Sequence, residues 1–214
     1  MGSARSDGTD GAGGVSDAAD AQLLAAHKIL IAGGFGAGKT TLDSAISEVR
    51  PLLTEERLSS VGAGLDDLRG VAGKTTTTVA MDFGRITISE RLVLYLFGVP
   101  GQERFWFMWD ELAFGALGAV VMADTRRLAD CFSSVDYFER RQTPFVVAAN
   151  HFEGAPVYST ATIREALDLD PDVPLLQCDA RSRESVKEVL ITTVTHSLTR
   201  HRQQRAQGGR VPAR

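Results

Sequence analysis

The stretch GGFGAGKTT, residues 33–41, predicts the fold of this chain. It fits the pattern G-x-x-x-x-G-K-[ST], with Gly33, Gly38, Lys39 and Thr40 in the fixed positions. Small residues let successive backbone N–H groups turn inward around phosphates, the lysine reaches the terminal phosphates, and the hydroxyl ligates Mg²⁺. A glycine-rich turn that binds nothing is the alternative. The apolar run before the stretch and the helical segment after it argue against that alternative.

The whole stretch is predicted to surround the phosphates and their metal ion. The residues that we expect to bind are Gly33, Gly34, Phe35, Gly36, Ala37, Gly38, Lys39, Thr40 and Thr41.

The pattern of the rest of the chain predicts an α/β fold. Strands are predicted at residues 27–32, 79–89, 91–97, 117–123, 145–149 and 173–178. Helices are predicted at residues 39–49, 105–112, 133–141, 160–167 and 182–198, with a further short helix near 54–60. Strands that alternate with helices imply a mostly parallel six-stranded sheet with helices on both faces. Ligands of such sheets bind beyond the carboxyl ends of the strands.

Length and composition predict one folded domain with two tails. Residues 1–24 are rich in Gly, Ser, Asp and Ala and are expected to be disordered, because they bury too little apolar surface. The folded domain is expected over residues 25–198. Residues 199–214 carry five arginines and no acid, and we expect a basic, unstructured tail. A solvated terminus and a contact with a membrane or partner both remain open for this tail.

Charge and hydropathy narrow the function classes. The net charge of −4 does not favour nucleic acid as a partner. The two cysteines, Cys131 and Cys178, have no metal-binding or disulfide spacing and are expected to be reduced and buried. No apolar run is long enough to span a bilayer, and no signal peptide is seen. We expect a cytoplasmic protein, monomeric or weakly oligomeric, that a partner could hold at the membrane.

A second motif follows the predicted strand at residues 91–97. It reads VPGQERF, residues 99–105. The N–H of Gly101 at a strand end can meet a γ-phosphate, and Gln102 beside it can orient a water molecule for in-line attack. The motif therefore indicates a site that senses a third phosphate.

These motifs resemble those of the Ras-like small GTPases. The pairing of KTTTTVAMDFG (residues 74–84) with FGVPGQERF (residues 97–105) more narrowly resembles the GTPases of actinobacterial conservons, which are relatives of the bacterial gliding-motility polarity GTPase. The resemblance covers roughly residues 28–197. It implies a G domain that binds GTP or GDP with Mg²⁺, hydrolyses GTP slowly and acts as a molecular switch in bacterial signalling. It also implies a Roadblock/LC7-type partner and a sensor-kinase-like membrane protein.

The resemblance assigns further site residues. Catalytic roles fall to Gln102, Lys39 and Thr78, and Mg²⁺ ligation falls to Thr40 and Thr78. The neighbouring threonines at 75–77 remain alternatives to Thr78, and all four could simply begin a strand. The base-binding segments are expected to be Asn150, His151 and Glu153, and then Asp179, Ala180 and Arg181.

Three departures from the family pattern qualify this assignment. Gly98 stands where the D-x-x-G motif has its metal-holding aspartate. Phe35 stands where Ras has the glycine that admits an arginine finger, and His151 replaces the lysine of N-K-x-D. Glu153 keeps the carboxylate that accepts from guanine but adds a methylene. We expect guanine preference, weakened metal affinity and no activation by an inserted arginine.

Two other functions compete with the switch. A nucleotide-binding scaffold with negligible turnover is kept open by Gly98 and Phe35. A small-molecule kinase is disfavoured because no arginine-rich lid is found. The aromatic run at residues 105–109 fits either core packing or a partner surface that includes Trp106 or Trp109.

Overall fold

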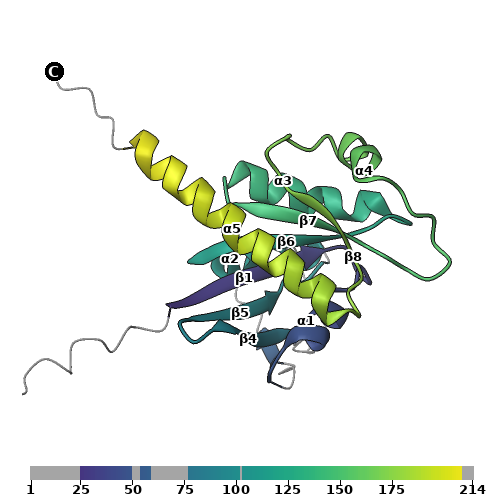
Figure 1. Ribbon diagram of the computed structural model, residues 1–214. Coiled ribbons are helices and arrows are strands. Elements are labelled where there is room, and N and C mark those ends of the chain that lie inside the picture. The colour runs from purple at the N-terminus through teal and green to yellow at the C-terminus, as the bar shows by residue number, and fades with distance from the viewer. Residues whose placement is uncertain (1–24, 50–53, 59–76, 102, 209–214) are drawn as a thin grey trace, which may run out of the picture.

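The computed structural model describes residues 25–49, 54–58, 77–101 and 103–208; at residues 54–58, 77–80, 103, 104, 207 and 208 it describes the backbone alone. A six-stranded sheet with helices on both faces forms the body of the molecule, as the sequence predicted (Figure 1). The strands of this sheet, in spatial order, are β4 (Phe83–Ser89), β5 (Leu92–Gly98), β1 (Ala25–Gly33), β6 (Ala116–Asp124), β7 (Phe145–Asn150) and β8 (Leu175–Cys178). Only the β4–β5 pair of this sheet is antiparallel.

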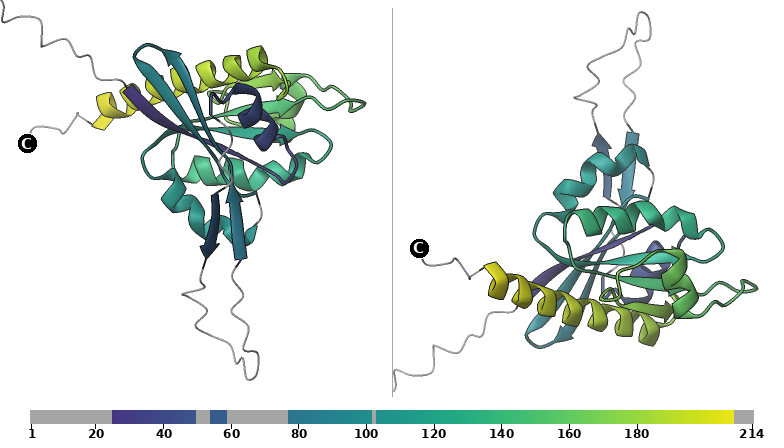
Figure 2. Two further views of the ribbon diagram at one scale, coloured as in Figure 1. Left: turned by 90° about the horizontal axis from the view of Figure 1, so that it is seen from below. Right: turned by 90° about the horizontal axis from the view of Figure 1, so that it is seen from above.

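The helices and 3-10 turns connect these strands. They are α1 (Lys39–Ile46), η1 (Glu103–Met108), α2 (Trp109–Ala113), η2 (Leu128–Cys131), α3 (Phe132–Arg140), α4 (Thr160–Ala166) and α5 (Arg183–Gly208). Helix α5 crosses one face of the sheet and α3 covers the other (Figure 2). The sequence predicts either Ser159 or Thr160 as the N-cap of α4, and the structure confirms Ser159, whose hydroxyl accepts a hydrogen bond from the Thr162 N–H.

Two apolar cores lie on the two faces of the sheet. Successive residues of β1 alternate between them: Ile29 and Ile31 pack with α1 and α5, and Leu30 and Ala32 pack with α3. Strand β7 is buried at every position, as expected for a parallel strand covered on both sides. This sheet brings the carboxyl ends of β1, β6, β7 and β8 to one edge.

At the β4 side of the sheet, the observed strands differ from the predicted ones. The single strand predicted at residues 79–89 is two strands, β3 (Thr77–Met81) and β4, separated by Asp82. Strand β3 leaves the main sheet and pairs with β2 (Thr54–Leu58) in a two-stranded ribbon that projects from the body (Figure 2). The short helix predicted near residues 54–60 is therefore wrong. Pairing with the β-branched residues of β3 outweighs the helical preference of TEERL.

Two helices also end elsewhere than predicted. Helix α1 stops at Ile46 and not at residue 49, because Ser47 is extended and the Glu48 N–H donates to the Arg85 carbonyl of β4 at 2.7 Å. Helix α5 continues to Gly208, so the expectation of an unstructured segment from residue 199 is wrong for residues 199–208. Residues 1–24 and 209–214 lie outside the described ranges. No helix in the described ranges is long and apolar enough to cross a membrane.

The aromatic run after β5 is divided between core and surface. Trp109 is 2% exposed, and its indole N–H donates to the Pro100 carbonyl at 3.1 Å. Trp109 also stacks beside Phe138 of α3, so it belongs to the core and not to a partner surface. Trp106 and Phe107 are 39% and 65% exposed.

Candidate nucleotide-binding site

The phosphate loop, residues 33–41, connects β1 to α1 as the motif requires. Gly38 lies in the left-handed region, at φ 105°, directly before the helix. Lys39 folds back, and its Nζ donates to the carbonyls of Gly33 and Gly34, both at 2.8 Å. Burial lowers the pKa of Lys39 to about 8, although the nearby Asp82 raises it. The lysine is thus placed within the loop where phosphates would be received.

A carboxylate that the motif analysis missed lies beside the loop. Asp82 accepts a hydrogen bond from the Thr40 hydroxyl at 2.5 Å. A Cβ built on Gly98 would lie 3.0 Å from the Asp82 Cβ, and the Gly98 N–H donates to the Asp82 carbonyl at 2.8 Å. Asp82 therefore fills the space beside Gly98, the residue that lacks a carboxylate. Asp82 was not among the residues predicted for the site, although it follows Thr78 by only four positions in the sequence.

A second carboxylate near Asp82, that of Asp43, is buried. Asp43, one turn along α1 from Thr40, is 2% exposed, and neither of its oxygens has a hydrogen-bond partner among the described residues. A Cβ on Gly84 would lie 1.9 Å from Asp43 Oδ1, so only glycine leaves room for this carboxylate. Burial, and then the charge of Asp82, raises the pKa of Asp43 to about 6.

The VPGQERF segment packs against the phosphate loop. A Cβ on Gly101 would lie 2.6 Å from the Gly33 carbonyl oxygen and 3.2 Å from the Lys39 Nζ. Only glycine brings the backbone this close to the phosphate loop and its lysine. Gln102 lies outside the described residues, and its role stays a prediction. Thr78 lies in β3 opposite Arg57, and its side chain is likewise not described.

The segment predicted to recognise the base, here called the base segment, begins at the end of β7. Asn150 is buried and joins two loops: its amide donates to the Ala37 carbonyl at 3.1 Å, and its oxygen accepts from the Ala180 N–H at 3.0 Å. The His151 N–H donates to the Cys178 carbonyl at 2.7 Å. Glu153 is exposed in the turn that follows. Asn150 thereby ties the base segment, the phosphate loop and the segment after β8 together.

The last predicted segment is structured by an ion pair. Arg181 forms a forked contact with Asp179, with Nε and Nη2 at 2.9 and 3.0 Å from the two carboxylate oxygens. The side-chain hydrogen bonds from Arg181 hold the pKa of Asp179 at about 2. The Ala180 N–H, which the family pattern directs to the base, is engaged by Asn150 in this structure. Its contact with a base stays a prediction.

The remaining loop residues surround the site. Phe35 is 71% exposed, and Thr41 lies in the first turn of α1. Two further residues that sequence analysis left unassigned, Arg126 and Arg127, contact the base segment and the phosphate loop respectively. Asp124, the buried last residue of β6, is paired with Arg126.

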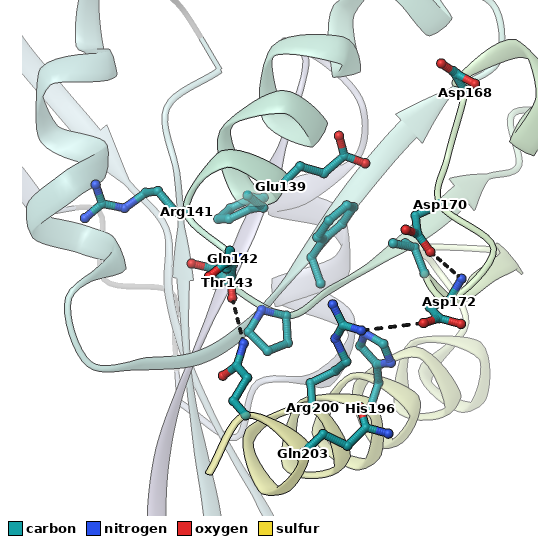
Figure 3. Close-up of a pocket in the computed structure, with 15 residues that line it drawn as sticks. Glu139, Arg141, Gln142, Thr143, Asp168, Asp170, Asp172, His196, Arg200 and Gln203 are labelled. Carbon is teal, nitrogen blue, oxygen red and sulfur yellow. Dashed lines mark hydrogen bonds and ion pairs between the residues drawn. The ribbon is translucent and has the colours of Figure 1, made fainter. Parts of the chain in front are cut away.

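A groove of about 950 Å³ lies elsewhere, between α3, α5 and the segment before β8 (Figure 3). Acidic side chains on its wall include Glu139, Asp168, Asp170 and Asp172, the last at 3.6 Å from Arg200. Burial and neighbouring aspartates raise the pKa of Glu139. The groove lies at the amino ends of β7 and β8. It is therefore separate from the loops that follow the carboxyl ends of the strands.

Solved structures share this architecture. The G domain of the T. maritima FeoB iron transporter aligns with a TM-score of 0.55 at 16% identity, over 81% of this chain and 99% of that one. The cytosolic domain of the same transporter in GDP form I gives 0.59 at 16%, over 81% of this chain and 64% of that one. The FeoB G domain of Methanococcus jannaschii gives 0.52 at 11%, over 80% and 98%. At such identities the likeness establishes the fold alone: the chain has the G-domain fold of P-loop GTPases.

The family is established by a separate comparison. Residues 31–200 match a family described as conserved hypothetical ATP binding proteins. Because the match covers most of the 214 residues, the chain belongs to this family. A search of curated proteins finds no match.

Replacement of Asp43 tests the electrostatics of the site. The raised pKa means that the folded state holds the Asp43 proton more tightly than the unfolded state, whose aspartates titrate near ~3.9. The ionised Asp43 carboxylate therefore lowers the free energy of unfolding. This cost is absent below about pH 4 and complete above about pH 6. Without nucleotide or Mg²⁺, Asp43→Asn should raise the free energy of unfolding by on the order of 2 kcal/mol at pH 7.5. The gain should shrink toward zero at pH 4.

Urea unfolding at both pH values measures the effect. A lower stability of the variant at pH 7.5 would mean that the carboxylate has a stabilising partner and would contradict this account. Glu90→Gln, at the exposed turn between β4 and β5, is the control and should leave stability unchanged at both pH values.

Proposed function

We propose that this chain is a slow GTPase that acts as a GTP/GDP switch in bacterial signalling. The observation that carries the proposal is the hydrogen bond between Thr40 and Asp82, because it puts a carboxylate beside the proposed metal ligand Thr40 although Gly98 has none. Gly101 on one side of the phosphate loop and Asn150 on the other support the same reading. Thr40, Gly101 and Asn150 lie at or just beyond the carboxyl ends of the parallel strands β1, β5 and β7.

The proposed nucleotide is a guanine nucleotide. Glu153 offers a carboxylate for the N1–H and exocyclic amine of guanine, whereas adenine presents an acceptor at N1. The family is described by ATP binding, whereas the similar cytosolic domain from T. maritima was solved in a GDP form. Of adenine and guanine nucleotides, the acidic residue at position 153 favours guanine nucleotides.

Mg²⁺ is the proposed cofactor, and the residues present fit it. Magnesium favours hard oxygen ligands and keeps several waters when it binds beside phosphates. The Thr40 hydroxyl would ligate the ion, Asp82 would orient that hydroxyl and a bound water, and Thr78 is proposed as the second hydroxyl ligand. No group of three His, Cys, Asp or Glu side chains that could hold a metal is found among the described residues. Binding would therefore depend on the phosphates.

Hydrolysis is proposed to use residues of two segments. Gln102 would orient the attacking water, and Lys39 would stabilise charge on the terminal phosphate oxygens. The ribbon of β2 and β3, which carries Thr78, and the segment from Gly98 to α2 are proposed as the elements that respond to the third phosphate. Phe35 at the mouth of the loop disfavours activation by an inserted arginine.

The cellular context is proposed from the sequence resemblance. We assign the chain to the conservon-type GTPases related to the gliding-motility polarity GTPase, with a Roadblock/LC7-type protein and a sensor-kinase-like membrane protein as partners. A cytoplasmic protein that reaches the membrane through such a partner follows from this assignment. The exposed Trp106 and Phe107 lie within the segment from Gly98 to α2 that would respond to nucleotide, which suits a partner contact.

A scaffold that binds nucleotide without turnover is the second candidate. It is favoured by Lys39, whose ammonium is occupied by the loop's own carbonyls, and by Gly98. In this function, the bound nucleotide would stabilise a partner-binding shape and would not be hydrolysed.

Competition binding tests the proposed base. GDP should displace a fluorescent guanine nucleotide at least tenfold more effectively than ADP, because a bidentate carboxylate contact is worth about 1–3 kcal/mol. Glu153→Gln should remove most of this preference. Equal affinities for GDP and ADP in the wild-type protein would overturn the assignment of guanine.

Single-turnover hydrolysis separates the switch from the scaffold. Wild-type protein with excess Mg²⁺ should convert bound GTP to GDP and phosphate faster than the buffer blank, and Gln102→Leu should slow this at least tenfold. Rates equal to the blank for both proteins would favour the scaffold. Transfer of phosphate to an acceptor other than water would indicate a kinase.

Replacement of Asp82 tests the metal assignment. Mg²⁺ should tighten GDP binding to wild-type protein relative to EDTA, and Asp82→Ala should reduce that enhancement about 10- to 100-fold, as is typical when a residue that orients a metal ligand is removed. Glu90→Gln removes a distant exposed carboxylate and is the matched control. An undiminished Mg²⁺ effect in Asp82→Ala would show that Asp82 has no role at the metal.

A further inference from the structure

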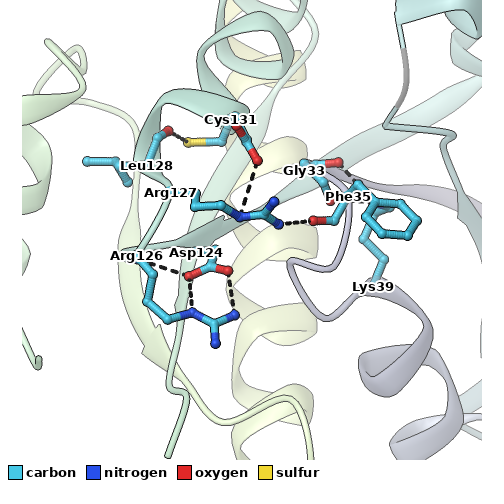
Figure 4. A network of polar contacts seen from close by, with 10 residues as sticks. Gly33, Phe35, Lys39, Asp124, Arg126, Arg127, Leu128 and Cys131 are labelled. Atoms are coloured by element: carbon cyan, nitrogen blue, oxygen red, sulfur yellow. Dashed lines mark hydrogen bonds and ion pairs between the residues drawn. The ribbon is translucent and has the colours of Figure 1, made fainter. Parts of the chain in front are cut away.

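Two adjacent arginines at the end of β6 extend to different parts of the site. Strand β6 ends at Asp124, and the chain turns before η2 begins at Leu128. Figure 4 shows the Arg126 side chain folded against Asp124 and the Arg127 side chain reaching toward Phe35. Consecutive side chains therefore contact the two loops that would hold opposite ends of a nucleotide.

Arg126 is fixed from both sides. Its Nε and Nη2 lie 2.9 and 2.7 Å from the two oxygens of Asp124, which is 3% exposed. The Arg126 N–H also donates to Asp124 Oδ1 at 3.0 Å. Hydrogen bonds from Arg126 lower the pKa of Asp124, and Asp124 raises the pKa of Arg126, so both effects favour the ion pair. A forked contact of this kind restricts the plane of the guanidinium.

The other face of Arg126 supports the base segment. Its guanidinium carbon lies 3.7 Å from the ring centroid of Phe152, a close cation–π stack. Phe152 lies between His151 and Glu153, in the turn that follows β7. The described contacts of the Glu153 side chain include no hydrogen bond. The stack with Arg126 thus anchors the residue that directly precedes Glu153, whose carboxylate would read the base.

Arg127 supports the phosphate loop instead. Its Nη2 donates to the Phe35 carbonyl, and its Nε lies 3.5 Å from Asp130 Oδ2. A Cβ on Gly36 would lie 3.5 Å from the same Nη2, and a Cβ on Gly34 would lie 2.5 Å from the Asp130 Cβ. Arg127 and Asp130 therefore pack against the phosphate loop at Gly34, Phe35 and Gly36.

We propose that Arg126 is a positioning residue for base specificity and that Arg127 is a positioning residue for the phosphate loop. Arg126 acts through Phe152 on the orientation of Glu153, so its loss lowers the discrimination between guanine and adenine nucleotides. Arg127 acts through the Phe35 carbonyl on the backbone N–H groups of the loop, so its loss weakens guanine and adenine nucleotides alike. The inference rests on the proposed guanine-nucleotide function.

The two arginines give opposite signatures in one experiment. The dissociation constants of GDP and ADP are measured by competition for the full chain and its variants. Arg126→Ala should reduce the ratio of ADP to GDP dissociation constants about tenfold, mostly by weakening GDP. Arg127→Ala should raise both constants by a similar factor and preserve the ratio. Arg140→Ala, at the end of α3, is the matched loss of an arginine elsewhere and should change neither constant.

Phe152 variants separate positioning from general damage. Phe152→Leu should lower the ratio as Arg126→Ala does, and the double variant should lose little more, because both changes remove the same stack. Phe152→Tyr keeps an aromatic face and should keep the ratio. Thermal unfolding of each variant accompanies the binding data.

Defined outcomes overturn the inference. If wild-type protein discriminates between GDP and ADP but Arg126→Ala weakens both equally or neither, Arg126 has no role in specificity. If Arg127→Ala changes the ratio as much as Arg126→Ala, the proposed division is wrong. If wild-type protein itself does not discriminate, the guanine assignment fails, and this result is distinct from either outcome above.

Discussion

The hydroxyl of Thr40 has a carboxylate partner, and much of the edge of the sheet is arranged to provide it. The Thr40 hydroxyl meets Asp82 at 2.5 Å, although Asp82 comes from the junction of β3 and β4 and not from the end of β5. Two neighbouring positions are glycines because a side chain there would clash. Gly98 lies against the Asp82 Cβ, and Gly84 leaves space for Asp43. The break between β3 and β4 and the glycine at position 98 are thus parts of one arrangement. A carboxylate missing from one strand is replaced by one from its neighbour.

This arrangement concentrates charge in a small volume. The Asp82 carboxylate acts on two neighbours: its charge raises the pKa of Asp43, and it opposes the burial that lowers the pKa of Lys39 to about 8. Asp43 has no hydrogen-bond partner among the described residues and has its pKa raised to about 6. Unpartnered charge of this kind lowers stability, and it is characteristic of sites built for ligands more than of sites built for stability. Phosphates and a divalent cation together match the charges that the site presents.

Much of the architecture could be predicted from the sequence because it depends on local patterns. The phosphate loop, the buried strands β1, β6 and β7 and the Ser159 cap have short signals whose physical cause lies within a few residues. The misses depend on contacts between distant segments. The sequence of β2 alone predicts a helix, but pairing with β3 makes it a strand. Helix α1 ends earlier than predicted because the Glu48 N–H donates to a carbonyl of β4. At the site, the sequence shows only that Gly98 lacks a carboxylate. The fold places the carboxylate of Asp82 beside it. The paired arginines Arg126 and Arg127 carried no motif, and only the geometry of the loops gives them partners.

A crystal structure of the full chain with Mg²⁺ and a non-hydrolysable GTP analogue tests the central claim most directly. The account predicts that the metal ion lies on the Thr40 hydroxyl and the phosphates. It also predicts that the Asp82 carboxylate lies within hydrogen-bond distance of that hydroxyl and of a metal-bound water. A metal site that Asp82 does not approach, with Thr40 held by another residue, would contradict it.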